Sequence, residues 1–539
     1  MVRPLTRRTF LAGPTTAVLA SQWQAAGALT RLGGTPVPGP PFTLGVASGD
    51  PRSTSVILWT RLAPDPLEGG GMPAVDVPVD WEVATDDGFG TVVRSGTAPA
   101  VADLAHSVHV EVSGLEPDTW YSYRFTAGGY ESPVGRTRTT PPAGDCTTPL
   151  RFAFASCQSY PSGYYTAHAN LADEGHDLVL WLGDYIYEGG VGSGVRQHNS
   201  AEVTDLPAYR NRYALYKSDL DLQASHHACP WSVVWDDHEV DNNYAGDVDQ
   251  DGSPTATFLQ RRAAAYQAWY EHQPVRLSAP TGPDLRIYRD LAWGDLVRFH
   301  LLDTRQYRSD QACFSGGLID PPCDELQNPD RTMLGATQES WLTEGLRSSG
   351  ATWNVVAQQV IFSAMPLVGN YNMDQWDGYP IERDRIRDVL AGDDVANPVV
   401  ITGDIHASGV ARVLADWDED GSAPQVATEL VGTSISSTFN EELAGLAEIV
   451  IGGIPWVDYV NATQRGYVVC DVDRDAMVAR YRVVDTALEP TSAVSTDHEV
   501  VIPASGPGAA CASPVSTTTT TPTSTTAAPA ATAVPRFTG

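Results

Sequence analysis

Short runs of β-branched and apolar residues recur along this chain, and each one ends abruptly on polar side chains. The clearest run covers residues 399–402, stops at Gly403 and is followed by Asp404 and His406. Such a run is typical of a buried strand, and parallel strands deliver the residues at their carboxyl ends to one edge of a sheet. The pattern therefore predicts several strands that assemble a site at a common edge. The other runs of this kind cover residues 151–157, 177–184, 232–239 and 297–305.

Two regions of the chain differ in the period of their apolar residues. Between residues 150 and 505, helical patterns such as Thr257–Gln273 and Gln338–Arg347 alternate with the strands, which predicts an α/β layer. Residues 42–140 instead show short alternating runs separated by turn residues, which favours a small N-terminal β-sandwich. Within it, Leu115–Tyr123 resembles the strand-entry corner of fibronectin type III domains. The predicted strands of this sandwich cover residues 55–60, 79–83, 107–112 and 120–125.

The two ends of the chain have compositions that do not fit a packed domain. Residues 1–30 carry Arg7 and Arg8, then a short, weakly apolar stretch and small residues, which predicts a twin-arginine export signal rather than a membrane span. Residues 31–41 form a Gly/Pro linker. Residues 512–539 are rich in Thr, Ala and Pro, and we expect them to be disordered. These features predict a secreted protein whose tail could associate it with the cell wall.

The charge balance narrows the classes of partner. The 539 residues carry 34 Lys and Arg against 66 Asp and Glu, a formal net charge of −32. Because nucleic acid and anionic membranes would be repelled, we expect neither as a partner. Beyond the N-terminal signal we expect no transmembrane helix. The acidity either keeps a secreted protein soluble or includes carboxylates that bind cations.

Seven cysteines, an odd number, are informative in an exported protein. Cys313 and Cys323 bracket a compact Gly/Pro-containing loop, and we predict that they form a disulfide. We expect Cys157 to stay out of any disulfide, because it ends an apolar strand alongside the other candidate ligands. A buried free cysteine can also serve simply as a small apolar residue. The remaining four, predicted to form two disulfides of undetermined connectivity, are Cys146, Cys229, Cys470 and Cys511.

The residues at the strand ends together have the composition of a two-metal site. A thiolate, a phenolate and an imidazole favour a ferric ion, whereas a pair of carboxylates favours Ca²⁺ or Mg²⁺. A further carboxylate, Asp184, ends its own strand three residues before Tyr187 and could bridge the two ions. In chain order the set is Cys157, Asp184, Tyr187, Asp237, His238, Asp404 and His406.

These ordered motifs resemble the PhoD-type alkaline phosphatases of the metallophosphoesterase superfamily over most of the chain. A match at many points in order is more specific than any single motif. The resemblance implies a fold of class α/β, with the N-terminal β-sandwich followed by a metallophosphoesterase-type αββα sandwich. The motifs are GVASGDP (45–51), FASCQ (154–158), GDYIYE (183–188), WDDHEVDNNYAGD (235–247), LDTRQYR (302–308) and GDIHA (403–407).

The resemblance also implies roles for individual residues. His238 is the candidate proton donor and Arg196 a candidate clamp on the phosphoryl oxygens, with an ordinary surface-loop position as the alternative for Arg196. Fe³⁺ would be held by Cys157, Asp184, Tyr187 and His406, and Ca²⁺ by Asp184, Asp237 and Asp404. Candidate supporting residues or additional ligands are Asp236, Asn242, Asn243, Asp303 and Arg305.

The function implied is that of a secreted, monomeric, metal-dependent alkaline phosphatase. It would hydrolyse small phosphate monoesters, and diesters as well, for phosphate scavenging. A calcium-dependent phospholipase D or phosphodiesterase acting on phospholipid head groups is the enzymatic alternative. A calcium-dependent surface adhesion module is the non-enzymatic one. The convergence of a thiolate and a phenolate on one sheet edge argues against adhesion.

Overall fold

The computed structural model describes residues 37–505 apart from 314, 316–318, 418–419 and 440. The predicted export signal, the C-terminal tail and Cys511 lie outside the described residues. Helices in the described part are α1 (Thr166–Asp173), α2 (Leu206–Lys217), α3 (Leu220–Ala228), α4 (Thr255–His272), α5 (Gly335–Ser348), α6 (Pro380–Leu390) and α7 (Glu441–Gly452).

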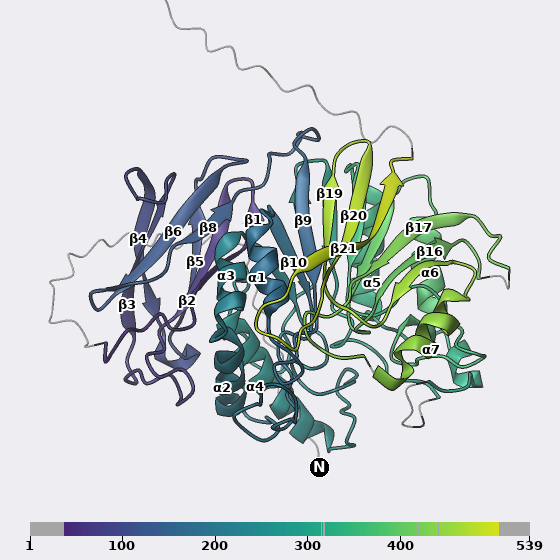
Figure 1. Ribbon diagram of the computed structural model, residues 1–539, viewed down its shortest axis with the longest axis horizontal. Coiled ribbons are helices and arrows are strands. Elements are labelled where there is room, and N and C mark those ends of the chain that lie inside the picture. The colour runs from purple at the N-terminus through teal and green to yellow at the C-terminus, as the bar shows by residue number, and fades with distance from the viewer. Residues whose placement is uncertain (1–36, 314, 316–318, 418–419, 440, 506–539) are drawn as a thin grey trace, which may run out of the picture. The chain divides into compact units, whose positions relative to one another are not determined.

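Two large sheets run through the described part of the chain (Figure 1). Their central strands are parallel, as the apolar runs predict. The first sheet has the order β21 (Val494–Pro503), β20 (Ala476–Val484), β19 (Arg465–Val472), β9 (Leu150–Ala155), β10 (Leu178–Leu182), β11 (Trp231–Val234), β1 (Val46–Arg52), β2 (Ser55–Arg61) and β5 (Ser107–Ser113). The second has the order β12 (Arg289–Trp293), β13 (Val297–Leu301), β14 (Trp353–Ala357), β15 (Pro398–Thr402), β17 (Gln425–Val431), β16 (Ser408–Leu414) and β18 (Val457–Asn461).

Alternate residues of the second sheet pack into two different cores. In β14 and β15, Val355 and Val399 belong to the core shared with the first sheet, where Phe152 meets Phe299 edge to face. The next residue of each strand packs instead with residues of α5 and α6. Because a strand points successive side chains to opposite faces, both faces of this sheet are covered. The arrangement is the αββα sandwich implied by the sequence motifs.

The N-terminal strands form a β-sandwich, and one of its two layers continues into the first large sheet. Strand β1 pairs in parallel with β11, with Gly49 opposite Trp231. A Cβ at Gly49 would lie 2.1 Å from the carbonyl oxygen of Pro274, so glycine permits this close approach. The second layer, packed on Val56, Leu58 and their neighbours, consists of β3 (Val77–Ala84), β4 (Val92–Ala100), β6 (Trp120–Ala127), β7 (Tyr130–Glu131) and β8 (Gly135–Arg138).

The cysteines confirm one predicted pairing and correct another. Cys313 and Cys323 form a disulfide with a Cα–Cα distance of 5.8 Å. Cys146 is also in a disulfide. The prediction that Cys229 and Cys470 are disulfide-bonded is wrong, because both are free and buried in the main core. There they act as small apolar side chains, a role that their spacing in the sequence does not reveal.

His300 in β13 makes part of the fold sensitive to acid. The side chain is 1% exposed, and neither ring nitrogen has a hydrogen-bond partner among the described residues. Burial, together with Arg298, lowers the pKa of His300 to about 4. An unfolded chain would bind a proton at this histidine below about pH 6.5, so the free energy of unfolding falls as the pH drops towards 4.

We therefore expect His300→Phe to flatten the pH profile of stability. Between pH 7 and pH 5 the free energy of unfolding of the unmodified protein should fall by about 2 kcal/mol more than that of the variant, because the pKa of His300 is lower in the folded than in the unfolded state. Urea unfolding at both pH values measures the difference. Parallel profiles for the two proteins would show that His300 does not resist protonation in the native state.

Candidate metal centre

The strand ends of both sheets meet, as predicted, and several of the residues there have a strained backbone. Cys157, Asp184, Asp404 and His406 all have positive φ angles, between 55° and 63°. This left-handed region is uncommon for non-glycine residues and concentrates at functional sites. A Cβ at Gly183 would lie 2.4 Å from that of Asp236, so glycine lets these two loops approach.

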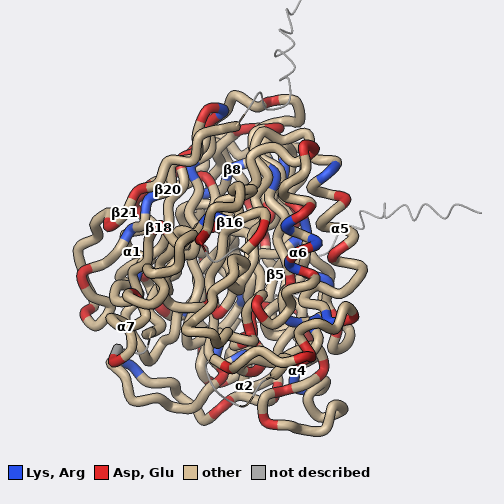
Figure 2. The backbone as a smooth tube through the Cα atoms, turned by 90° about the vertical axis from the view of Figure 1, so that its right-hand side faces the viewer, with Lys and Arg blue, Asp and Glu red and all other residues tan. Residues whose placement is uncertain are grey.

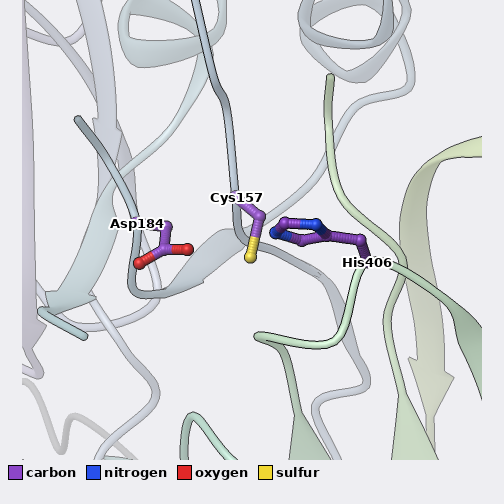
Figure 3. A group of neighbouring side chains, drawn as sticks. All are labelled: Cys157, Asp184 and His406. Carbon is purple, nitrogen blue, oxygen red and sulfur yellow. The ribbon is translucent and has the colours of Figure 1, made fainter. Parts of the chain in front are cut away.

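Three overlapping groups of ligand atoms form at this edge, each with its atoms within 4.8 Å of one another. Figure 3 shows the first, in which the Cys157 thiol lies between the Asp184 carboxylate and the His406 ring. Asp184 also belongs to the second group, and Asp237 joins the second to the third. The groups are Cys157, Asp184 and His406; Asp184, Asp237 and His238; and Asp236, Asp237 and Asp404.

Tyr187 is held at the first group by its hydroxyl. Its oxygen lies 2.8 Å from Oδ2 of Asp184, 3.0 Å from Nε2 of His406 and 2.7 Å from Oγ of Ser437. Nδ1 of His406 lies 3.1 Å from the carbonyl oxygen of Thr438, to which it donates. That bond leaves Nε2 as the acceptor, the form in which histidine binds a metal.

Arg305 lies among the carboxylates of the third group and is fully buried. Its Nε donates to Asp236, and its Nη1 lies 2.8 Å from Asp374. Its Nη2 is 3.6 Å from both Asp237 and Asp404. Asp236, predicted as a supporting residue, therefore orients Arg305.

The donor atoms fit bound cations. Among the described residues, Oδ1 of Asp184, Oδ2 of Asp236 and Oδ1 of Asp237 are buried without a hydrogen-bond partner. Buried carboxylate oxygens are normally paired or bound to metal. The soft donors gather around Cys157, whereas the carboxylates gather around Asp237 and Asp404. The cluster thus offers donors of both chemical classes, and three of its carboxylate oxygens have no partner among the described residues.

Burial and charge set the protonation of this cluster. Burial raises the pKa of Asp184 well above its usual range, and His238 only partly opposes this. Burial likewise raises the pKa of Asp404 to about 7 despite Arg305. For Asp237 burial acts in the same direction, but Arg305 and His238 overcome it and lower the pKa to about 2. Metal binding would deprotonate the raised groups, because only the anionic forms are ligands.

Two glutamates that the sequence interpretation did not single out organise the site. Oε2 of Glu188 lies 2.7 Å from Nδ1 of His238, whose ring lies 4.1 Å from that of Tyr187. Glu239 is fully buried and accepts the backbone N–H groups of Asp184 and Asp236 at 3.0 and 2.8 Å. Both residues occur inside the motifs 183–188 and 235–247. Asp374, Ser437 and Gln375 were also missed, and they lie outside these motifs. The side-chain amide of Gln375 donates to Oδ2 of Asp404 at 2.7 Å.

Arg196 is not brought to the metal cluster. Its guanidinium pairs with Asp219 at 2.6 Å, donates to the carbonyl oxygens of Tyr160 and Gly163, and lies 3.8 Å from the Tyr160 ring centroid. The proposed clamp on phosphoryl oxygens is therefore replaced by an anchoring role for the loop. The loop itself lines a cleft of about 880 Å³ together with Tyr187, Glu188, His238 and Thr438.

The remaining candidate residues act through other groups. The backbone N–H of Asn243 donates to Oδ2 of Asp237 at 2.6 Å, and the side-chain amide of Asn242 donates to Gln250. Asp303 is fully buried and accepts the backbone N–H of Arg305 at 3.1 Å. It supports the backbone at Arg305, while Asp236 and Asp374 hold the guanidinium.

The chain is similar in sequence and fold to known proteins. A family model described as PhoD-like phosphatase matches residues 152–481, and one for the N-terminal domain of PhoD-like phosphatases matches residues 28–141. Alkaline phosphatase D of Bacillus subtilis (strain 168) is 50% identical over 471 residues, 85% of this chain and 80% of that protein. A solved structure described as PhoD matches with a TM-score of 0.83 at 48% identity, covering 86% of this chain and 91% of that one.

Proposed function

We propose that this chain, which belongs to the PhoD-like phosphatase family and is a phosphoric ester hydrolase, releases phosphate from monoesters. We further propose that the enzyme is secreted and monomeric and that it serves phosphate scavenging. The observation that carries the proposal is the sharing of Asp184 and Asp237 among three adjacent ligand groups. Shared carboxylates are what a site for two neighbouring cations requires.

The donor chemistry supports Fe³⁺ and Ca²⁺ as the cofactors. A thiolate, a phenolate and an imidazole suit a ferric ion, held by Cys157, Asp184, Tyr187 and His406. The oxygen ligands Asp184, Asp237 and Asp404 suit calcium. When bound, such cations would supply a nucleophile at neutral pH and neutralise charge on the phosphoryl oxygens. Iron and calcium contents, with a visible charge-transfer band that disappears in Cys157→Ala, test this assignment.

His238 is positioned to donate a proton to the departing alkoxide. It lines the cleft, and one of its ring nitrogens lies within 4.8 Å of oxygens of Asp184 and Asp237. Burial alone would lower the pKa of His238, but the carboxylates of Glu188, Asp184 and Asp237 raise it well above its usual range. In the protein without bound cations these charges favour the protonated imidazole, the form that a proton donor needs.

We expect Glu188→Gln to lower kcat about 10- to 100-fold, the usual cost of losing a residue that orients a site histidine. The amide keeps the shape of the side chain but no longer stabilises the imidazolium, so kcat should fall more than KM rises. Steady-state kinetics with a chromogenic monoester measure the changes in kcat and KM separately. Glu202→Gln, at an exposed position that pairs with Arg261, is the matched control.

The choice between monoesters and diesters is tested with paired chromogenic substrates. Turnover of 4-nitrophenyl phosphate exceeding that of bis(4-nitrophenyl) phosphate supports the phosphatase assignment. Cleavage of the diester alone overturns it in favour of the calcium-dependent phosphodiesterase. The adhesion alternative has no support in the site, where the buried Cys157 thiol and the Tyr187 phenol both lie beside the carboxylate of Asp184. No helix in the described part of the chain has the length and apolarity needed to cross a membrane.

A further inference from the structure

A second cavity, of about 650 Å³, lies away from the metal cluster. It includes Arg298 near the start of β13, whereas Asp303 and Arg305 follow the end of that strand. Five residues of extended strand span roughly 16 Å. The walls come from both the N-terminal segments 50–53 and 140–143 and the later segment 276–298. The cavity is therefore a separate feature at the junction of the β-sandwich with the rest of the protein.

Five arginines line this cavity against three aspartates, in a chain whose net charge is −32. Acidic and basic segments are otherwise interspersed along the tube in Figure 2. Arg289 pairs with Asp50, and Arg298 pairs with Asp290. The remaining lining arginines are Arg52, Arg276 and Arg286. The cavity is thus a local reversal of the protein's charge, where an anion would be attracted.

Two of the lining arginines have no carboxylate of their own. Within the described part of the chain, Arg52 and Arg286 make neither an ion pair nor a side-chain hydrogen bond, and Arg286 lies 4.2 Å from the Tyr288 ring centroid. The charge of Arg52 also acts on Arg276, whose pKa is lowered by burial and by Arg52 although Glu111 opposes both. Arg52 and Arg286 are both solvent-exposed, so their positive charges are accessible to an anion that enters the cavity.

We propose that this cavity is a second phosphate-binding site, distinct from the metal cluster, in which Arg52 and Arg286 hold a phosphoryl group. Guanidinium groups match phosphate oxygens with paired N–H donors, and two of them with free donors can neutralise a dianion. The volume is that of a small-molecule site, and Tyr288 and Trp341 supply an aromatic wall beside the arginines. The ligand is inorganic phosphate or the phosphoryl group of a monoester.

Equilibrium dialysis of the metal-loaded protein with radiolabelled phosphate tests the proposal. We expect two phosphate sites per chain, and one in the double variant Arg52→Ser/Arg286→Ser, with the affinity of the lost site reduced at least tenfold. Arg347→Ser/Arg474→Ser is the matched control, because these arginines also make no ion pair with any described residue but do not line the cavity. This variant should keep both sites. A single site in the unmodified protein, or two sites in the cavity variant, overturns the proposal.

Two further measurements complete the test. The kcat of the cavity variant should be unchanged, which shows that the variant folds and separates failure of this proposal from failure of the proposed phosphatase function. Competition with phenylphosphonate, a non-hydrolysable mimic of a monoester, distinguishes the ligand sources. Displacement of phosphate from the second site identifies a monoester-binding cavity, and retention of phosphate there restricts the cavity to the inorganic ion.

Discussion

Replacement of Asp184 by alanine should lower kcat for a phosphomonoester at least ~10³-fold, equivalent to about 4 kcal/mol of transition-state stabilisation. The carboxylate belongs to two of the three ligand groups, so its loss removes a ligand from both proposed cations. The fold should persist, because burial disfavours the charged form of this side chain and its removal relieves that cost. Kinetics, bound-metal content and urea unfolding measure the three effects.

Asp173→Ala is the matched control for this variant. Asp173 is exposed at the end of α1 and belongs to none of the ligand groups, so both activity and metal content should stay unchanged. Cys157→Ala should resemble Asp184→Ala in activity while changing the visible spectrum more strongly. Near-normal turnover in Asp184→Ala would disprove its role as a shared ligand.

Replacement of Arg305 by methionine should destabilise the fold by about 3–5 kcal/mol, the usual cost of removing one partner of a buried ion pair. The guanidinium is fully buried and contacts Asp236 and Asp374 directly. Without it, Asp236, Asp237 and Asp404 lose a buried positive neighbour, and Asp374 keeps Arg308, so the four carboxylates would repel one another more strongly. Urea unfolding at saturating metal concentration measures the loss.

The same variant should depend more strongly on added metal for its stability. Cations at the third ligand group can replace part of the lost positive charge, so the gain in Tm on adding Ca²⁺ should exceed that of the unmodified protein. Arg305→Lys keeps the charge and should recover part of the stability without the paired N–H geometry. Equal responses to metal in all three proteins would show that Arg305 does not serve the carboxylates of the site.

The local pattern of the chain was sufficient to predict several of the elements and much of the cluster. Strands at 55–60 and 107–112 and helices near 257–273 and 338–347 appear where their periods place them. The proximity of Cys157 and Asp184 followed because the carboxyl ends of neighbouring parallel strands meet at one edge of a sheet. His406 follows a strand of the second sheet and joins them because the two sheets pack together.

Contacts between residues distant in sequence could not be predicted in this way. Glu188 pairs with His238, and Asp219 pairs with Arg196. Both pairs form through loop packing, which leaves no periodic signal in the sequence. The same holds for the parallel pairing of β1 with β11 and for the free state of Cys229.

The sequence by itself determined the α/β class, the order of the strand-end ligands and the two kinds of donor chemistry. These depend on residue type and on spacing within a single element, which local backbone geometry converts directly into position. Only the tertiary structure decided which carboxylates are shared, which side chain orients His238, and that Arg52 and Arg286 line one cavity. Those outcomes depend on how separate elements pack, because side chains far apart in the chain become neighbours only when both sheets and their loops are assembled.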